Sequence, residues 1–533
     1  MSATSPEARL ERAGLWLALL LCAALAWPLR HYVTDDTFIH LQYARNVARG
    51  EGFVFNPGEH VYGCTSPLWV LLLADAIAMG VDGLVAAKLL GAAATLAALF
   101  LWVSLVRRTL GSPWLRALST LVWAAHAWML RWSLSGMETP LAVVLVLGGL
   151  VAFVATEPWG ERPVLPGLLW ALAALARPEC VFLLVLWGAL LVVDRGARAG
   201  LSHAARGLWP AALLYGGWLA FARTTFGTFW PNTLAAKAAG GAGLDYGLEQ
   251  LVRQGAIVFA TDGVLVGALV AVTLAGAFRG QRTRLRPAVR LLPIAWLLAV
   301  PALYVARGVP VLSRYLVPLL PVLAWLAWRA LDRALRTWPG TSAPSLARAL
   351  GGGPDMAGTP AGVRAALVTV AVIAALALAQ NLTTYARVVR PQVESFTAGM
   401  ERSLIPWGRW FDLHAEPDAV IAAPDIGALG YYGRRRVVDL AGLVTPELVP
   451  ILDRMPQEDA TARFEFARIA RPDFLVDRAA RAWDMERRSP WSAALVPLGH
   501  ASLPNLGVAR PGEAVYSFYR IDWAAYDSLA ASR

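Results

Sequence analysis

Long apolar runs recur along most of this 533-residue chain and constrain its fold more than any other feature. A helix that spans a membrane needs about 20 apolar residues, or fewer where neighbouring protein shields its ends. The chain is 57% hydrophobic and 16% charged, which is too apolar for a soluble protein of this length. We therefore predict a polytopic α-helical membrane protein. The candidate spans are 14–29, 84–106, 114–130, 139–156, 164–176, 179–193, 208–222, 256–278, 290–306, 313–328 and 365–380.

The positions of the arginines predict how the chain crosses the membrane. The net charge is +11, and most arginines stand in short loops between apolar runs. This basicity indicates topology in a lipid bilayer and not a nucleic-acid partner. The run 67–80 is short, and Asp75 interrupts it. If it only enters the interface, the basic loops fall together on the cytoplasmic side, as the positive-inside rule prefers. We expect about 11 spans, a cytoplasmic N-terminus, a first outer loop at 30–83 and an outer C-terminus.

A change of composition after residue 380 predicts two domains. We expect a transmembrane domain over 1–380 and an extracytoplasmic α/β domain over 381–533, where short apolar runs alternate with helical stretches. The three glycines between 427 and 433 are expected to punctuate a loop. Expected strands are 419–423, 437–440 and 516–521, and expected helices are 446–454 and 460–470.

The stretch 34–46 follows the first apolar run and holds the first candidates for chemistry. Thr34 can cap a helix whose first turn carries Asp35 and Asp36, where the helix dipole favours ionised carboxylates. Apolar positions share one face, so this amphipathic helix should lie in the membrane interface. A carboxylate there could take a proton from an attacking hydroxyl or hold a cation. The alternative is a solvated N-cap pair, although acids beside a span are costly unless they are used or solvated.

Two further acidic positions fall on the same predicted outer face. Glu138 follows a candidate span, where it could cap the next helix or contact a substrate. Arg177 and Glu179 stand between two short spans. They could form a structural ion pair or part of a substrate site, and the residue types alone do not decide between the two.

Basic and aromatic residues on the outer face could bind phosphate. Asn232 lies in a loop of aromatics and amides near Lys237, and a cation beside interfacial aromatics could bind a lipid phosphate, although such aromatics usually serve as anchors. Arg307 and the pair Arg314–Tyr315 stand at the outer ends of late spans, against the usual charge bias. A guanidinium fork suits a phosphate.

The motifs that the sequence lacks also bear on function. It contains no Gly-x-x-x-x-Gly-Lys-Ser/Thr loop, no His-Glu-x-x-His and no Cys/His cluster. We therefore predict no metal site and no certain cofactor, although a divalent cation could assist. The cytoplasmic segments are too short for a nucleotide-binding domain. A group-transfer reaction would therefore take its donor from the membrane.

An ordered series of motifs resembles one bacterial family, the GT-C glycosyltransferases related to the mycobacterial terminal arabinofuranosyltransferases. Its first-outer-loop pattern is Asp35-Asp36-Thr37-Phe38-Ile39, Tyr43-Ala44-Arg45-Asn46, Gly50-Glu51-Gly52, Phe55-Asn56-Pro57-Gly58-Glu59 and Thr65-Ser66-Pro67-Leu68-Trp69. The likeness continues in Gly136-Met137-Glu138-Thr139, Arg177-Pro178-Glu179, Pro231-Asn232-Thr233 with Lys237, Arg314-Tyr315, Asp425-Ile426-Gly427-Ala428-Leu429-Gly430-Tyr431-Tyr432 and Asp439-Leu440-Ala441-Gly442-Leu443.

This resemblance implies a GT-C fold in a bacterial inner membrane. It implies a sugar donor carried on polyprenyl phosphate and a glycan acceptor of the cell envelope in the outer compartment. It also implies a catalytic aspartate in the first outer loop, here Asp35 or Asp36. His60 and Cys64 depart from the expected pattern, so the sugar stays open, with arabinofuranose as one candidate.

Together, the residues and the resemblance predict a glycosyltransferase. Asp36 or Asp35 would deprotonate the acceptor hydroxyl, which would displace the phosphate with inversion at the anomeric carbon. The alternative is a transporter or flippase of lipid-linked sugars; against it, the charges gather on one face and no repeated halves are visible. The residues expected to bind the donor's phosphate or sugar are Lys237, Arg314, Arg177, Glu138, His40, Asn232, Tyr315 and Arg307.

Overall fold

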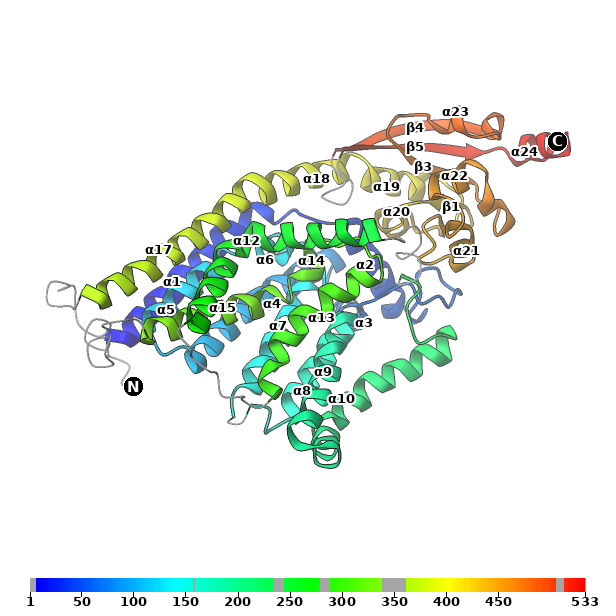
Figure 1. Cartoon of the computed structure of the whole chain (residues 1–533). Coiled ribbons are helices and arrows are strands. Elements are labelled where there is room, and N and C mark those ends of the chain that lie inside the picture. The colour runs from blue at the N-terminus through cyan, green and yellow to red at the C-terminus, as the bar shows by residue number, and fades with distance from the viewer. Residues whose placement is uncertain are drawn as a thin grey trace.

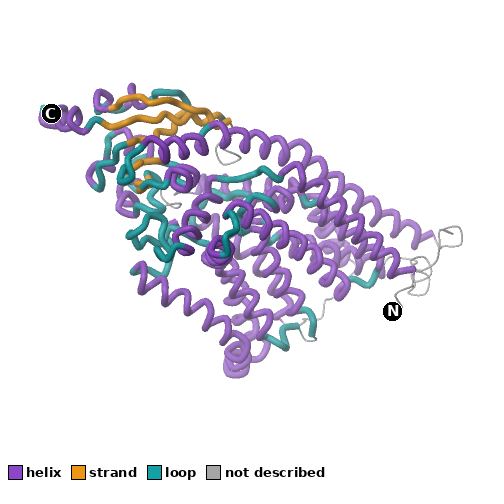
Figure 2. Tube along the Cα trace, turned by 180° about the vertical axis from the view of Figure 1, so that it is seen from behind, coloured by secondary structure: helices purple, strands orange, loops and turns teal. Residues whose placement is uncertain are grey.

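The computed structural model describes residues 6–156, 159–233, 244–278, 288–337, 361–504 and 512–532. Most of them form an elongated bundle of helices, and a sheet built from the C-terminal residues lies at one end of it (Figure 1). Seen from behind, the strands again gather at that end only (Figure 2).

The bundle contains long and short helices. They are α1 (Pro6–Ala26), α2 (Asp35–Ala48), α3 (Pro67–Ala78), α4 (Gly83–Thr109), α5 (Pro113–Ala124), α6 (Ala127–Ser133), α7 (Thr139–Phe153), α8 (Val164–Ala176), α9 (Val181–Arg195), α10 (Ala197–Phe226), α12 (Leu244–Phe278), α13 (Leu292–Ala306), α14 (Ser313–Leu316), α15 (Leu320–Thr337) and α17 (Ala361–Thr384). Short 3-10 turns η1 (Trp27–Leu29), η2 (Pro178–Cys180) and η3 (Ala288–Leu291) join some of them.

Within the described ranges, five helical segments are long and apolar enough to cross a membrane. They are Glu7–Leu29, Gly83–Thr109, Tyr246–Ala277, Ala288–Ala306 and Ala361–His414. The helices α3, α7 and α8 are apolar but shorter. The protein is therefore a polytopic helical membrane protein, and the finer expectation of about 11 spans stays a prediction.

The predicted span 114–130 is divided into two helices, α5 and α6. His126 caps α6 by accepting the backbone N–H of Met129 at 3.4 Å, and its Nε2 lies 3.0 Å from the Asp262 carboxylate of α12. Asn381 of α17 accepts the backbone N–H of Ala127 at 3.0 Å. Asn381 and His126 thus satisfy backbone N–H groups where the helix breaks, and Asp262 holds the His126 ring.

The chain enters the C-terminal domain without leaving the helical conformation. A π-helical turn, η5 (Tyr385–Val389), joins α17 to α18 (Arg390–Arg402), and α19 (Leu404–His414) follows. Residue 381, expected to begin the second domain, therefore lies inside a continuous helix. Figure 1 shows α17 and α18 as one rod that runs from the bundle to the sheet.

Five strands form the sheet in the order β2-β1-β3-β5-β4. They are β1 (Val420–Ala423), β2 (Arg436–Asp439), β3 (Phe474–Ala479), β4 (Leu495–Pro504) and β5 (Glu513–Ile521). β1 is parallel to both β2 and β3, whereas β5 is antiparallel to β3 and β4. Short helices accompany them: α20 (Gly427–Gly433), α21 (Val449–Leu452), α22 (Gln457–Ala462), α23 (Met485–Arg488) and α24 (Trp523–Ala531).

The segment 30–83, which is expected to be the first outer loop, fastens this domain to the bundle, and the two are named the first outer loop and the outer domain after that expectation. Asn56 donates to Val437 O at 2.9 Å and accepts the Val437 N–H at 3.0 Å, so it continues the edge of β2. Glu59 pairs with Arg436 at 2.6 Å. Phe38 of α2 belongs to the same buried apolar cluster as side chains of β1, β5 and α20. The two domains therefore share a core at this junction.

Three local expectations differ from the structure. The residues from Thr37 to Ala44 are all buried, so α2 is enclosed between the domains and has no open polar face, while its position at the membrane interface stays a prediction. Residues 427–433 form the helix α20 and not a loop, because Asp35 binds its first N–H groups. The expected helix 460–470 is interrupted after α22, where Phe464 takes a left-handed φ of 58°.

Candidate functional site

The N-terminus of α2 forms as its sequence predicts. The Thr34 hydroxyl accepts the Thr37 N–H at 3.3 Å, and the Thr37 side chain accepts the Thr34 N–H in return. Thr37 also donates its hydroxyl to Ser135 O at 2.8 Å. This capping box fixes the first turn, and with it the directions of the two carboxylates that follow Thr34.

Asp35 is directed at the outer domain. Its two carboxylate oxygens accept the backbone N–H groups of Gly427 and Ala428, each at 2.8 Å. A Cβ at residue 427 would lie 1.9 Å from the Asp35 carbonyl oxygen, so only glycine allows this approach. Burial and the carboxylate of Asp425 raise the pKa of Asp35 to about 7, although the two N–H groups act in the opposite direction.

Asp36 is directed at the membrane domain, where it pairs with the guanidinium of Arg314. The Asp36 side chain is 41% exposed, whereas that of Arg314 is only 7% exposed. Arg314 also lies over the rings of Trp132 at 5.8 Å and Tyr315 at 5.3 Å. The pair therefore presents an accessible carboxylate beside a cation that is held rigidly by aromatic side chains.

A second group of charges is buried beside this pair. Arg177 bonds Glu138 at 2.7 Å and Glu179 at 2.6 Å, and it lies over the ring of Tyr315 at 4.8 Å. His40, one turn after Asp36 on α2, has its Nδ1 3.9 Å from the Glu138 carboxylate. Burial lowers the pKa of His40, although the charge of Glu138 opposes this. A neutral imidazole next to a paired carboxylate can orient a hydroxyl.

The loop that carries Glu138 is held from several sides. Trp69 of α3 donates its indole N–H to Gly136 O at 3.1 Å, and Lys88 of α4 donates to Leu134 O at 2.9 Å. Gly136 has a φ of +81°. A Cβ on Gly136 would lie 2.5 Å from the Thr37 side chain. Position 136 therefore requires glycine for two reasons: its φ is positive, and there is no room for a side chain.

Six of the predicted site residues come together through direct contacts or through the mutual effect of their charges. They are Asp36, Arg314, Tyr315, Arg177, Glu138 and His40. Asn232 lies against the first outer loop, where its N–H donates to Tyr62 O at 2.8 Å. Arg307 is exposed at the C-terminal end of α13. Lys237 lies outside the described residues.

Sequence reasoning did not assign several side chains that surround the aspartates. Asp425 accepts hydrogen bonds from Arg478 at 2.5 Å and Tyr516 at 2.7 Å, and its charge acts on Asp35. Trp132 supports Arg314 and donates to Ser313 Oγ at 3.0 Å. Asp425 belongs to one of the motifs that carry the resemblance, and this is its one sequence signal for a place near the site. No sequence feature indicates such a place for Arg478, Tyr516 or Trp132.

Among the described residues, no group of three or more His, Cys, Asp or Glu side chains is placed to hold a metal ion. Asp35 and Asp36 diverge, because one faces α20 and the other faces α14. A divalent cation at this site stays an expectation.

Comparison with solved structures identifies the fold. ArnT from Cupriavidus metallidurans bound to undecaprenyl phosphate has a TM-score of 0.58 at 16% identity, covering 95% of this chain and 97% of that one. The apo oligosaccharyltransferase of Archaeoglobus fulgidus has a TM-score of 0.55 at 14% identity, with 88% and 69% coverage. The arabinofuranosyltransferase AftD from Mycobacteria has a TM-score of 0.50 at 15% identity, with 97% and 42% coverage.

The chain is thus a membrane protein of the GT-C glycosyltransferase fold. In sequence, it is similar to the terminal beta-(1->2)-arabinofuranosyltransferase of Mycobacterium tuberculosis, with 30% identity over 259 residues. That match covers 43% of this chain and 39% of the relative, so the chain spans well under half of the curated relative that it matches. A family model described as a domain of unknown function (DUF8728) matches residues 392–519, which include β1 to β4 and most of β5.

Proposed function

We propose that this protein transfers a sugar from a polyprenyl-phosphate donor to a hydroxyl of an extracytoplasmic glycan or lipid of a bacterial cell envelope. The observation that carries the proposal is the pair of Asp36 and Arg314, an accessible carboxylate beside a rigid cation. The GT-C fold supports it, as does the undecaprenyl phosphate bound to ArnT. The similarity to a terminal arabinofuranosyltransferase favours arabinofuranose as the sugar.

The surroundings of the two aspartates favour Asp36 as the general base. Asp35 uses both carboxylate oxygens to hold α20. Asp36 keeps 41% of its side chain exposed and can meet an incoming hydroxyl. A base must lie within hydrogen-bond reach of the proton that it removes, and exposure is a condition for this.

The cations of the site suit the leaving phosphate. When the sugar departs, negative charge grows on the phosphate, and a fixed guanidinium stabilises that charge without reorganising. Arg314, which pairs with Asp36, would supply this guanidinium, and Lys237, Arg307 or Asn232 would complete the phosphate site. Arg177 holds Glu138, which would orient the sugar together with His40 and Tyr315.

The reaction is then a single displacement. The acceptor oxygen attacks the anomeric carbon and loses its proton to Asp36. The bond between the anomeric carbon and the phosphate oxygen breaks, and polyprenyl phosphate leaves with the electron pair. Attack opposite to the leaving group inverts the anomeric centre, and the protonated Asp36 returns its proton to water on the outer side.

The decisive experiment replaces one carboxylate by its amide. We expect Asp36→Asn to lower the rate of polyprenyl phosphate release by about 100-fold or more, the usual contribution of a general base, while donor binding is retained. Asp75→Asn is the matched control, because Asp75 is exposed on the nearby α3. Full activity in Asp36→Asn would exclude Asp36 as the base. Donor movement across liposomes without bond cleavage would instead indicate a flippase.

A further inference from the structure

The charges of the candidate site do not by themselves favour the binding of an anion. Arg314 pairs with Asp36, and Arg177 bonds both Glu138 and Glu179. These side chains bring three formal negative charges and two positive ones. A phosphate that enters beside them therefore needs a further cation that no carboxylate already neutralises.

Arg131, in the last turn of α6, is a cation of this kind. The residue is only 7% exposed. Its Nη1 donates to the side-chain oxygen of Gln392 at 2.7 Å. In the part of the chain that the structure describes, its Nε has no hydrogen-bond partner and no carboxylate pairs with it. A buried charge is costly unless an opposite charge compensates it, so this guanidinium is available to an anionic ligand.

Trp132 connects Arg131 to the candidate site. The guanidinium of Arg131 lies 5.5 Å from the centroid of the Trp132 ring, and that of Arg314 lies 5.8 Å from it. Arg131 also lies over the ring of Tyr32 at 5.5 Å. Aromatic rings hold both cations in place but bring no net negative charge to neutralise them. An anion that reaches Arg314 is therefore also attracted by Arg131.

A second cation reaches the same aromatic side chains. Lys88 of α4 donates its ammonium to Tyr32 O at 2.8 Å and to Leu134 O at 2.9 Å. Both partners are neutral carbonyls, and an ammonium has three N–H donors. Among the described residues, no carboxylate pairs with Lys88. Positive charge from α4 and α6 thus gathers around Tyr32, next to the candidate site.

The side chain that Arg131 binds in the structure can give way to a ligand. Gln392 of α18 is neutral and only partly buried. It offers Arg131 one neutral oxygen, whereas a phosphate offers a guanidinium fork two charged oxygens. A phosphate can therefore replace the Gln392 amide at Arg131 with a gain in interaction energy.

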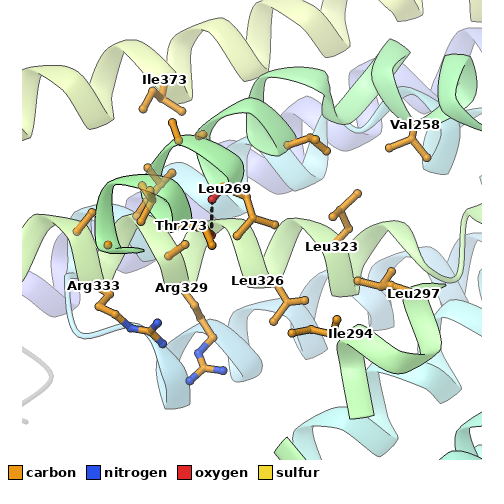
Figure 3. A pocket seen from close by; sticks show the side chains of 18 of the residues that line it. Val258, Leu269, Thr273, Ile294, Leu297, Leu323, Leu326, Arg329, Arg333 and Ile373 are labelled. Atoms are coloured by element: carbon orange, nitrogen blue, oxygen red, sulfur yellow. Dashed lines mark hydrogen bonds between the residues drawn. The ribbon is translucent and has the colours of Figure 1, made fainter. Parts of the chain in front are cut away.

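Space for a lipid chain begins near these cations. A cavity of about 1860 Å³, lined mostly by aliphatic side chains, lies between α12, α13, α15 and α17 (Figure 3). Figure 3 shows Val258 toward one end of it and Arg333 toward the other. Next to Val258, the carbonyl of Ile257 accepts the indole N–H of Trp128 at 2.8 Å. Trp128 precedes Arg131 by less than one turn of α6. The apolar tail of a lipid can thus lie in the cavity while its phosphate lies at α6.

We propose that Arg131 binds the phosphate of the lipid-linked sugar donor, beside Arg314 and with Lys88 adding positive charge. This inference rests on the proposed glycosyl transfer and adds a phosphate-binding residue from α6 to the candidates from the outer loops. A glycerophospholipid head group carries the same phosphate chemistry, and the experiment separates the two sources. Arg131 binds and takes no part in the proton transfer to Asp36.

The test measures lipid binding by the purified full-length protein in detergent with native mass spectrometry. The probes are undecaprenyl phosphate and undecaprenol, which share the chain and differ in the phosphate. We expect Arg131→Gln to weaken the binding of undecaprenyl phosphate about 10- to 100-fold, the range of a lost hydrogen bond to a charged group. Binding of undecaprenol should not change. Arg387→Gln is the matched control, because Arg387 is an exposed cation of η5, which contacts α6.

A second variant separates phosphate binding from a structural role of Arg131. Gln392→Glu would place a carboxylate at the position of the amide that Arg131 now binds. The new ion pair should keep the melting temperature at least as high, yet weaken the binding of undecaprenyl phosphate about 10- to 100-fold. If Arg131 only joined α6 to α18, the same variant would leave lipid binding unchanged. It also replaces Arg131→Gln if that variant does not fold, because Gln392 is partly exposed.

Each other outcome overturns the inference. Unchanged binding of undecaprenyl phosphate in Arg131→Gln and Gln392→Glu would exclude Arg131 from the phosphate site, while sugar transfer by the wild type would leave the proposed function standing. An equal loss in Arg387→Gln would indicate a general effect of surface charge. Equally tight competition by phosphatidylglycerol would assign Arg131 to membrane lipids and not to the donor. A wild type that neither binds undecaprenyl phosphate nor transfers a sugar would remove the proposed function as well.

Discussion

At the scale of single residues, two neighbouring aspartates have different surroundings. Asp35 accepts two backbone N–H groups of the outer domain, and Asp36 pairs with a guanidinium of the membrane domain. Successive residues of a helix point about 100° apart, so one turn of α2 can serve two domains. The first carboxylate binds the outer domain, and the second is the base in our proposal.

After the Asp36→Asn experiment, a second prediction concerns Arg314, the cation that pairs with Asp36. Arg314→Lys keeps the charge but loses the planar fork and the stacking on Tyr315 and Trp132. We expect kcat/KM for the donor to fall about 10- to 100-fold, the range of a lost hydrogen bond to a charged group. Arg402→Lys serves as the control, because Arg402 is exposed in the last turn of α18 and has no role in the proposed site. An equal loss in both variants, measured by initial rates at varied donor concentration, would contradict the assignment of Arg314.

The sequence predicted the cap and the acidic pair but could not separate the roles of the two acids. Capping depends on residues within one turn, and Thr34 and Thr37 carry that signal themselves. The partners that distinguish the acids are remote: Gly427 lies 392 positions from Asp35, and Arg314 lies 278 positions from Asp36. Only the folded chain brings such positions together.

At the scale of elements, the expectations that depend on neighbouring residues are correct. Those for elements that depend on contacts remote in the sequence are wrong. The strands near 420 and 437 and the first outer helix follow from local composition. The break between α5 and α6 does not, because Asp262 and Asn381 from other helices stabilise it. Residues 427–433 have the glycine content of a loop, yet the Asp35 carboxylate holds them as a helix. Tertiary contacts override local preference at these two places.

The third prediction tests the turn that links α2 to the loop of Glu138. Gly136→Ala would place a methyl group 2.5 Å from the Thr37 side chain, at a φ of +81°. Gly58→Ala is a matched control, with the same φ of +81° but no atom within 4 Å. We expect Gly136→Ala to destabilise the protein by about 1–3 kcal/mol more than Gly58→Ala, the usual cost of overpacking. Thermal unfolding in detergent measures the difference, and equal melting temperatures would contradict this prediction.

At the scale of the whole molecule, several contacts bind the outer domain to the bundle, including the hydrogen bond from Arg45 to Tyr431 O at 2.7 Å. The Asp35 carboxylate holds α20, Asn56 extends β2, and Glu59 pairs with Arg436. All three come from the first outer loop or the helix that begins it. The segment that carries the candidate base therefore also determines where the outer domain sits above it.

The fourth prediction concerns the pH dependence of this docking. When the outer domain is docked against α2, burial and the nearby charges of Asp425 and Asp36 raise the pKa of Asp35 from 3.8 to about 7. The docked form thus binds a proton more tightly than the undocked form. The contribution of Asp35 protonation to the free energy of docking is therefore fully present below about pH 4. It is lost as the pH rises through about 7, by at most about 1.4 kcal/mol per pH unit.

Hydrogen exchange at Gly427 and Ala428 measures this docking directly, because Asp35 binds both amides. After correction for intrinsic exchange, protection should decrease between pH 5 and pH 8 by at most about tenfold per unit. Asp35→Asn, which cannot ionise, should remove this slope. The amides of β5 serve as the internal reference. A slope that persists in Asp35→Asn would assign the pH dependence to another group.

The helical passage from α17 through η5 into α18 has a mechanical consequence. A flexible linker would let the sheet drift above the lipid, whereas a continuous rod makes its height follow the inclination of α17. An apolar helix adjusts its inclination to the thickness of the surrounding hydrocarbon layer. In thinner membranes α17 would lean further, and the sheet would stand closer to the head groups. The reach of this protein into the envelope would then depend on the lipids around it.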